Sequence, residues 1–333
     1  MGRKDHHHAV SNKEDKLLQR VLQFQTKTGV RPSVPSKHDR IGFVFSTRER
    51  VDYSVRSLER LDTESVDIVW IDGSDTTRGR AFAAQHQLRK ANVLERHLDI
   101  TGGPDATIRF GLQRLLDLGY DYCGLIENDV LLQPGWLAGL LNLFQMASFD
   151  GIAVGAATVR TYACRILEYR SGYALVWNLG AGMAFFPKAA CEIILDDYRQ
   201  PRARQIQRFY AETFGLDIGD IWELRYGFFD RNLGADWYFG PRLYSRGYAS
   251  VCSLPSMAVD LDLAPEETVK HAPTSQERKL AQGIRPVHGA KVWGIRAADV
   301  CGGLGAAVYR RLGKQNPLRK RRISQFSRRL RAK

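Results

Sequence analysis

The sequence predicts an α/β fold in which a doubly wound, mostly parallel sheet is flanked by helices. Between about residues 40 and 130, short apolar segments alternate with segments of helical periodicity. Strands that alternate with helices of about ten residues or more favour parallel pairing through right-handed crossovers. Several of the apolar segments also end in charged residues. Ligands of such sheets bind beyond the carboxyl ends of the strands, so these charged residues mark a candidate site.

The expected elements follow from local pattern in chain order. A helix is expected at about Leu17 to Phe24, within a polar stretch. Runs rich in β-branched and aromatic residues, bounded by polar ones, predict the strands. A turn at Gly102, Gly103 and Pro104 is expected to open the last helix. The strands are expected at 40–46, 66–71, 91–95 and 122–127, and the other helices around 55–58 and at 79–90 and 106–118.

Composition excludes several classes of protein. The chain has 333 residues, of which 44% are hydrophobic and 26% charged, as in ordinary globular proteins. It contains no apolar stretch near the roughly 20 residues that cross a bilayer. The first residues lack the apolar region of a signal peptide, so a cytoplasmic protein is expected. The five cysteines form no Cys-x-x-Cys pair, which argues against both a disulfide framework and a zinc site.

The net charge of +13 is concentrated at the C-terminus. Residues 310–333 contain eleven Lys or Arg and no acidic residue. Ile323, Phe326 and Leu330 recur there at helical spacing, which is typical of a basic amphipathic segment on an anionic membrane surface. We therefore expect a peripheral protein on the inner face of a membrane. A solvated tail is the alternative, and nucleic acid is disfavoured because the only stacking aromatics nearby are Tyr309 and Phe326.

An acidic pair follows the apolar run that begins at Tyr122. Glu127 and Asp129 are two residues apart, so their side chains are expected on the same side of the strand end. Oxygen ligands suit Mg²⁺ or Mn²⁺, and such ions are often shared with substrate phosphates. Asp72 ends an earlier strand and should face the same region. A solvated acidic turn is the alternative reading of the pair.

The common phosphate-binding and hydrolase motifs are absent from the sequence. There is no Gly-x-x-x-x-Gly-Lys-Ser/Thr motif, no Gly-x-Gly-x-x-Gly motif after the first strand and no Gly-x-Ser-x-Gly motif. Asp72 and Asp75 are three residues apart and so do not form an Asp-x-Asp phosphatase motif. What remains is a phosphate held through a metal ion.

The order of motifs resembles a GT-A glycosyltransferase and is most similar to family 2. The resemblance covers about residues 39–290. It rests on the strand ending in Asp72-Gly73-Ser74-Asp75, the glycine turn before the helix with Arg109, and the acidic pair. Two later segments extend it, Asn178-Leu179-Gly180-Ala181-Gly182 and Gly234-Ala235-Asp236-Trp237.

This resemblance implies a division of the chain and a set of site residues. A polar extension, 1–38, would precede a GT-A domain, 39–300, and the tail, 301–333. The domain would have a nucleotide-binding half, 39–132, and an acceptor half, 133–300. Donor contacts are expected from Ser46, Arg48, Asp72, Gly103, Arg109, Glu127 and Asn128. Metal ligands are expected at Glu127, Asp129 and His271, with His288 as the rival of His271.

The acceptor side of the resemblance supplies the expected catalytic base, Asp236. A helix N-cap is the alternative role for this residue. Gly180, Gly182 and Trp237 are expected near the acceptor, although tight strand packing would equally explain the two glycines. The aromatic residues around Trp222, Tyr226, Phe228 and Phe229 could be core or could stack under a sugar.

The resulting hypothesis is a metal-dependent inverting glycosyltransferase. It would use a nucleotide-diphosphate sugar and a lipid-linked or surface-polysaccharide acceptor. One alternative is a nucleotidyltransferase, although Ser46-Thr47-Arg48-Glu49-Arg50 lacks the glycine-rich loop that such enzymes carry. The other is a non-catalytic protein that binds a sugar nucleotide or RNA.

Overall fold

The computed structural model describes residues 8–100, 102–162, 165–218, 233–261 and 285–286. Its helices are α1 (His8–Thr28), α2 (Val51–Leu61), α3 (Thr77–Gln85), α4 (Gly103–Asp117), α5 (Trp136–Phe149), α6 (Lys188–Asp196), α7 (Ala203–Phe214) and α9 (Phe239–Ser245), with a 3₁₀ helix, η2 (Ala235–Tyr238). Its strands are β1 (Ile41–Thr47), β2 (Asp67–Asp72), β3 (Asn92–His97), β4 (Tyr122–Glu127), β5 (Val130–Leu132), β6 (Val154–Thr158), β7 (Ile166–Tyr169), β8 (Tyr173–Val176), β9 (Met183–Pro187), β10 (Leu216–Asp217), β11 (Ala249–Ser253), β12 (Ala258–Asp260) and β13 (Arg285–Pro286).

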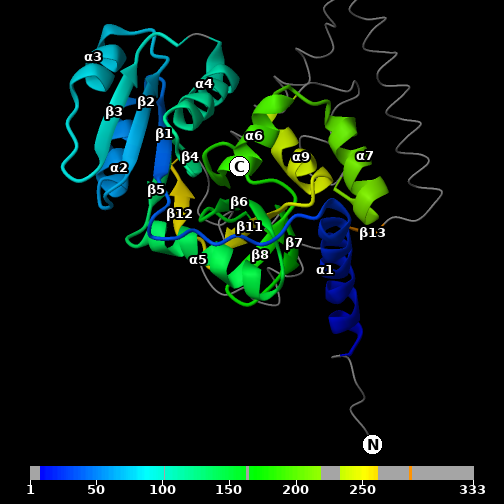
Figure 1. The fold of residues 1–333 in the computed structure, drawn as a ribbon. Helices are drawn as coiled ribbons and strands as arrows, with labels where there is room; N and C mark the ends of the chain where they lie inside the picture. Colours follow the sequence, from blue (N-terminus) through cyan, green and yellow to red (C-terminus); the bar gives the residue numbers. More distant parts are fainter. Residues whose placement is uncertain (1–7, 101, 163–164, 219–232, 262–284, 287–333) are drawn as a thin grey trace, which may run out of the picture.

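Within these residues one nine-stranded sheet runs through the molecule in the order β3-β2-β1-β4-β9-β6-β11-β8-β7. The pairs β3-β2, β2-β1, β1-β4 and β6-β11 are parallel, and β9 and β8 run against their neighbours. Seven of the nine strands therefore point the same way. The predicted fold class, a doubly wound and mostly parallel sheet flanked by helices, is confirmed (Figure 1).

The sheet is covered on both faces, and its strands are apolar on both faces as a result. Helices α4, α6 and α9 bury apolar side chains against one face, and α2, α3 and α5 against the other. Phe43, Phe185 and Trp136 show how the second layer packs, because Phe43 stacks on Phe185 and meets the edge of Trp136. This two-sided core holds the strand ends in a fixed arrangement.

The predicted helix at 79–90 ends earlier than its periodicity suggested. Helix α3 stops at Gln85, and the chain after it is held by a carboxylate from another element. The backbone N–H groups of Arg89, Lys90 and Ala91 all donate to Asp62, at 2.8–3.1 Å. These contacts lower the pKa of Asp62, against the opposing effect of burial. A long-range contact therefore overrides the local helical pattern.

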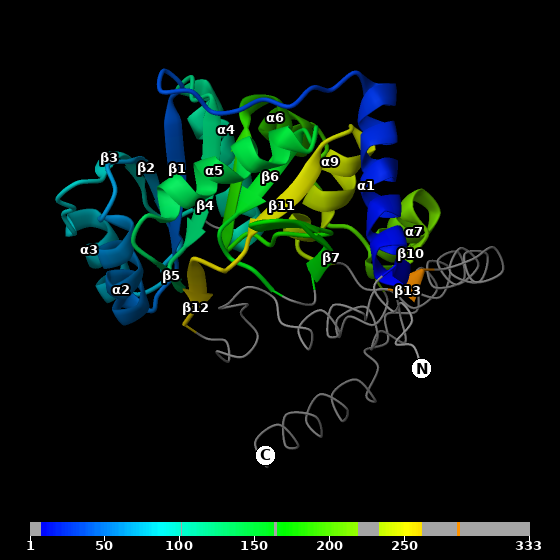
Figure 2. The same ribbon diagram turned by 90° about the horizontal axis from the view of Figure 1, so that it is seen from below.

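Helix α1 extends well beyond the predicted segment and packs against the sheet. It lies at the outer strand β7 and also meets α9 (Figure 2). Leu18 and Val21 are buried there, and the backbone N–H of Leu18 donates to Glu168 Oε2 at 3.1 Å. None of the described helices, α1 included, is both long enough and apolar enough to span a bilayer.

Candidate active site at the carboxyl end of the sheet

The sheet changes its winding direction between β1 and β4. The chain passes from β1 outward to β2 and β3, and then returns to β4 on the opposite side of β1. Ligands of open α/β sheets bind outside such a switch point. Ser46 pairs in register with Glu127 there, and Thr47 pairs with Asp72. The structure thus places three of the predicted donor residues at neighbouring strand ends.

The loop after β1 is tied to the loop after β2. Glu49 and Arg50 adopt left-handed backbone conformations, with φ of 53° and 49°. The Glu49 carboxylate accepts hydrogen bonds from the backbone N–H groups of Asp75 and Thr76 and from the Thr76 hydroxyl. The contact with Thr76 holds the pKa of Glu49 below its usual value. Arg48 pairs with Asp75 at 3.1 Å, and both side chains are largely exposed.

Asp72 is fully buried and its carboxylate is occupied by the protein itself. It accepts hydrogen bonds from Thr47 Oγ1 at 2.7 Å and from Ser74 Oγ at 2.8 Å. Trp70 Nε1 donates in turn to Thr47 Oγ1, which completes a buried network. The network links the ends of β1 and β2, where the two loops begin. A direct contact of Asp72 with a nucleotide stays a prediction.

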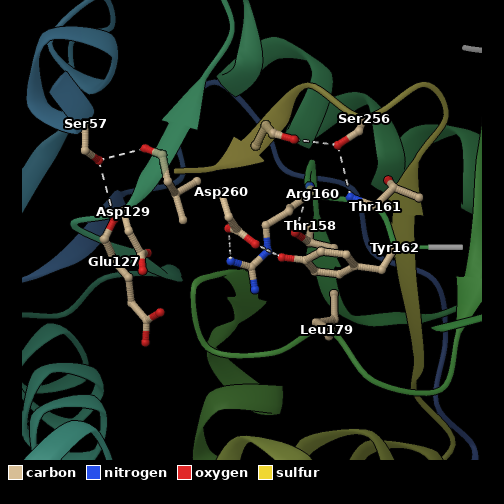
Figure 3. Close-up of polar contacts among 12 residues, drawn as sticks. Ser57, Glu127, Asp129, Thr158, Arg160, Thr161, Tyr162, Leu179, Ser256 and Asp260 are labelled. Carbon is tan, nitrogen blue, oxygen red and sulfur yellow. Dashed lines mark hydrogen bonds and ion pairs between the residues drawn. The ribbon is translucent and has the colours of Figure 1, made fainter. Parts of the chain in front are cut away.

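The acidic pair lies where β4 meets β5 (Figure 3). Glu127 and Asp129 are partly exposed, whereas Asn128 between them is buried and donates to Ser54 Oγ at 2.9 Å. Ser57 Oγ also donates to Val130 O at 2.8 Å, which fixes the turn to α2. The alternation of partly exposed and buried side chains from 127 to 129 agrees with the expectation that both carboxylates face one side. Arg50 lies 3.5 Å from Asp129.

Burial raises the pKa of Glu127 to about 7, and several charges modulate it. Arg160 lowers this pKa, while Asp129, Asp236 and Asp260 raise it. These groups come from distant segments, so the sheet gathers four carboxylates and one arginine within electrostatic range. Two oxygen-donor carboxylates at a strand end fit a hard divalent cation that shares substrate oxygens. Among the described residues, however, no group of three metal-ligating side chains is found.

Arg160 follows β6 and forms a buried ion pair. Its Nη1 lies 2.7 Å from Asp260 Oδ1, with only 7% and 8% of the two side chains exposed. The hydroxyl of Tyr162 donates to the other oxygen of Asp260. Figure 3 shows Arg160, Tyr162 and Asp260 as one cluster beside the acidic pair.

Gly180 and Gly182 leave room for two arginine side chains. A Cβ on Gly182 would lie 2.0 Å from Arg160 Nη1, and one on Gly180 would lie 2.5 Å from Arg165 Nη1. Gly180 also has a φ of +79°, which disfavours any other residue. The expectation of tight packing is therefore met, with arginines in place of a neighbouring strand. Contact with an acceptor is untested.

Asp236 lies in the first turn of η2, and Gly234 occupies the N-cap position. Its carboxylate accepts a hydrogen bond from the backbone N–H of Ala181. Burial raises the pKa of Asp236, with Arg165 opposing and Asp105 adding to the effect. Asp105, in the first turn of α4, also accepts from the Ala235 N–H at 2.9 Å, so α4 fixes the position of η2.

Trp237 sits in an aromatic and cationic cluster. Its ring lies 5.5 Å from that of Trp177, and the Arg165 guanidinium lies 6.0 Å from its centre. Arg165 also stacks on Tyr162 at 4.7 Å. Trp237 is partly exposed, as a ring that contacts an acceptor would need to be.

Of the remaining predicted site residues, the structure describes two on α4 and leaves the others outside the described part of the chain. Gly103 has a φ of +75° and open space around its Cβ position, and Arg109 is exposed on α4. His271, His288 and the aromatic residues at 222, 226, 228 and 229 lie outside the described residues, as does the basic tail.

Sequence reasoning missed Arg160, Arg165, Tyr162, Asp105 and Asp260. A usable signal was present for Arg160, because it closely follows a small apolar strand whose carboxyl end lies at the same edge as those of β1 and β4. Asp260 had no local signal, since its partner is 100 residues away.

Neither family models nor curated proteins match the chain. Among solved structures it is similar to the mannosyltransferase PcManGT from Pyrobaculum calidifontis in complex with GDP-Man and Mn²⁺, at 14% identity and a TM-score of 0.36. That match covers 60% of this chain and 62% of the other, less than two thirds of the mannosyltransferase structure. A second similar structure, A197 from STIV, has 13% identity and a TM-score of 0.34, and covers 71% of this chain and 95% of the other. Similarity at this level does not establish a shared activity.

Proposed function

We propose that the chain is a metal-dependent inverting glycosyltransferase of the GT-A type, resembling family 2. It transfers a sugar from a nucleotide-diphosphate donor to an acceptor hydroxyl. The observation that carries the proposal is the gathering of Glu127, Asp129 and Asp236 around Arg160, next to the β1/β4 switch point. Such an edge can hold a charged donor on one side and a base on the other.

Glu127 and Asp129 are the residues that would hold the divalent cation, with His271 as a further candidate. Bound there, a metal ion would supply positive charge for the departing diphosphate. The partly exposed guanidinium of Arg50, beside Asp129, adds positive charge on the same side. In this proposal Ser46, Arg48 and the Gly103 turn contact the nucleotide.

Asp236 is the proposed general base. Its carboxylate takes the proton of the acceptor hydroxyl while the acceptor oxygen bonds to the anomeric carbon. The bond from that carbon to the phosphate oxygen breaks, and its electron pair leaves with the nucleoside diphosphate. A carboxylate whose pKa is raised is a better base near neutral pH than an ordinary one. Attack opposite to the leaving group inverts the anomeric centre.

The first experiment is thermal unfolding with UDP-, GDP-, dTDP- and CMP-linked sugars, with and without Mn²⁺. A ligand that binds only the folded protein raises the melting temperature by mass action. We expect one nucleotide to give a metal-dependent shift that Asp129→Ala abolishes and Asp75→Ala retains. No shift with any donor under either condition would contradict the proposal.

For the acceptor, we propose a lipid-linked or surface polysaccharide reached from an anionic membrane surface. The support is the sequence of residues 310–333, which contains eleven Lys or Arg. Each basic residue near an anionic membrane surface contributes on the order of 1 kcal/mol to the free energy of binding. Deleting 310–333 should abolish sedimentation with phosphatidylserine vesicles and leave turnover of a soluble acceptor unchanged. Equal binding by the shortened chain would overturn this part.

A further inference from the structure

The segment from Gly180 to Gly182 connects the two sides of the proposed site. The carbonyl oxygen of Gly182 accepts a hydrogen bond from the backbone N–H of Glu127 at 2.9 Å. The next residue back, Ala181, donates its N–H to the carboxylate of Asp236. One short stretch of backbone therefore contacts both the acidic strand end and the proposed base.

The guanidinium of Arg160 packs against this segment. It approaches Gly182 so closely that an added Cβ would lie 2.0 Å from Nη1 and 2.8 Å from Cζ. Its Nη2 also lies 3.1 Å from the Cβ position of Gly180. Both glycines thus leave the room that the guanidinium of this one arginine occupies.

Asp260 fixes the position of Arg160. Both side chains are more than nine-tenths buried, and a buried charge that loses its partner is strongly unfavourable, so the pair is held firmly. Arg160 Nε has no hydrogen-bond partner among the described residues. The orientation of the guanidinium therefore follows its ion pair with Asp260 and leaves one of its own donors unsatisfied.

The strand that carries Asp260 also holds the acidic pair. Strand β12 pairs with β5, which directly follows Asp129, and Asp260 lies opposite Val130. The next residue, Leu261, donates its backbone N–H to the carbonyl oxygen of Asp129 at 2.8 Å. Asp260 is thus linked to one side of the site through its backbone and to the other through Arg160.

We propose that the Arg160–Asp260 ion pair is a positioning element that fixes the Gly180–Gly182 segment and thereby sets Asp236 relative to Glu127 and Asp129. Its effect on turnover rests on the function proposed above. Neither Arg160 nor Asp260 need touch the substrate for this role. Displacing a reacting group by about 1 Å can lower the rate about a hundredfold.

The test compares Asp260→Asn with a matched control, Glu168→Gln. Glu168 is also buried and paired with an arginine, Arg170, at 3.2 Å, but it lies on β7 beyond the site. In Asp260→Asn we expect faster hydrogen exchange at the amides of Ala181 and Glu127, unchanged affinity for the nucleotide diphosphate, and kcat lower by about a hundredfold. Glu168→Gln should change none of these three quantities.

Two milder variants keep the test decisive if Asp260→Asn does not fold. Tyr162→Phe removes only the hydroxyl that donates to Asp260, and Arg160→Lys keeps the charge but loses the planar guanidinium. Both should accelerate exchange at Ala181 and lower kcat without a matching change in KM for the donor. Wild-type exchange and kcat in these variants would overturn the proposal.

Failure of the proposed function gives a different result. If the wild-type chain transfers no sugar from any donor, the function fails, but hydrogen exchange still reports whether the ion pair fixes the segment. If the wild-type chain transfers sugar and all three variants do so equally well, the positioning role fails alone.

Discussion

The two sides of the site differ in how their charges are held. On the β1/β2 side, Arg48 and Asp75 form a 3.1 Å pair with 60% and 78% of the side chains exposed, and Arg50 meets Asp129 loosely at 3.5 Å. On the β6/β12 side, Arg160 and Asp260 are almost completely buried at 2.7 Å. Exposed charges can exchange their partners for a ligand at little cost, whereas buried ones cannot. The first side is suited to binding and the second to positioning.

The largest expected effect is at Asp236, on the positioned side. Asp236→Asn should lower kcat by about a hundredfold or more, because the acceptor proton loses its base. Donor affinity, measured by the metal-dependent thermal shift, should stay at the wild-type value. The matched control is Asp196→Asn, which should keep full turnover. Asp196 is an exposed acid on α6 that pairs with Arg242. Wild-type turnover in Asp236→Asn would remove Asp236 from the mechanism.

The next effect tests how tightly the buried side is packed. Gly182→Ala places a methyl group 2.0 Å from Arg160 Nη1, so we expect a loss of about 1–3 kcal/mol in the free energy of unfolding. Gly29→Ala is the comparison, since it meets no atom within 4 Å and bears only the strain of a φ of +71°. Denaturant unfolding measures both. Equal losses would mean that the glycine segment can shift away from Arg160.

A third prediction concerns the ion pair between Glu95 on β3 and Arg114 on α4. Hydrogen bonds from Arg114 hold the pKa of Glu95 at about 2. The folded-state pKa is below the unfolded value, so this stabilisation is present above about pH 4 and is lost as the pH falls towards 2. Glu95→Gln should therefore cost about 1 kcal/mol at pH 7, discounted for partial exposure.

The cost of Glu95→Gln should shrink when unfolding is measured at pH 3. A difference between variant and wild type that stays constant from pH 7 to pH 3 would show that the carboxylate charge is not its source.

The smallest effect on stability is expected at Arg48. Arg48→Ala should change the free energy of unfolding by less than about 0.5 kcal/mol, because its pair with Asp75 is exposed. If Arg48 contacts the donor, nucleotide affinity should nevertheless fall. Arg78→Ala, which breaks a similarly exposed pair with Asp52, controls for loss of charge and should keep that affinity. Equal affinities in the two variants would remove Arg48 from the donor site.

The same contrast explains what could be predicted from the sequence. Strands β1, β2 and β4 were expected because their β-branched and aromatic runs are local signals, and Glu127 and Asp129 were found because they lie two residues apart at the end of one such run. The end of α3 was missed because it depends on Asp62, 27 residues before Arg89. Arg160 and Asp260 were missed because each gains its role from a partner 100 residues away in the chain. Residues marked by a local motif were therefore accessible to sequence reasoning, whereas the buried pair of Arg160 and Asp260 was not.

Helix α1 has a consequence for association between molecules. Strand β7 is the last strand of the sheet, and α1 lies along it. An uncovered outer strand offers a row of unpaired N–H and C=O groups that can recruit a strand from another chain. At the opposite margin, β3 carries Glu95, Arg96 and His97, charged and polar side chains that discourage such pairing. The N-terminal helix thus covers one edge of the described sheet, and we expect a shortened chain that begins after residue 28 to expose β7 to pairing with a strand of another chain.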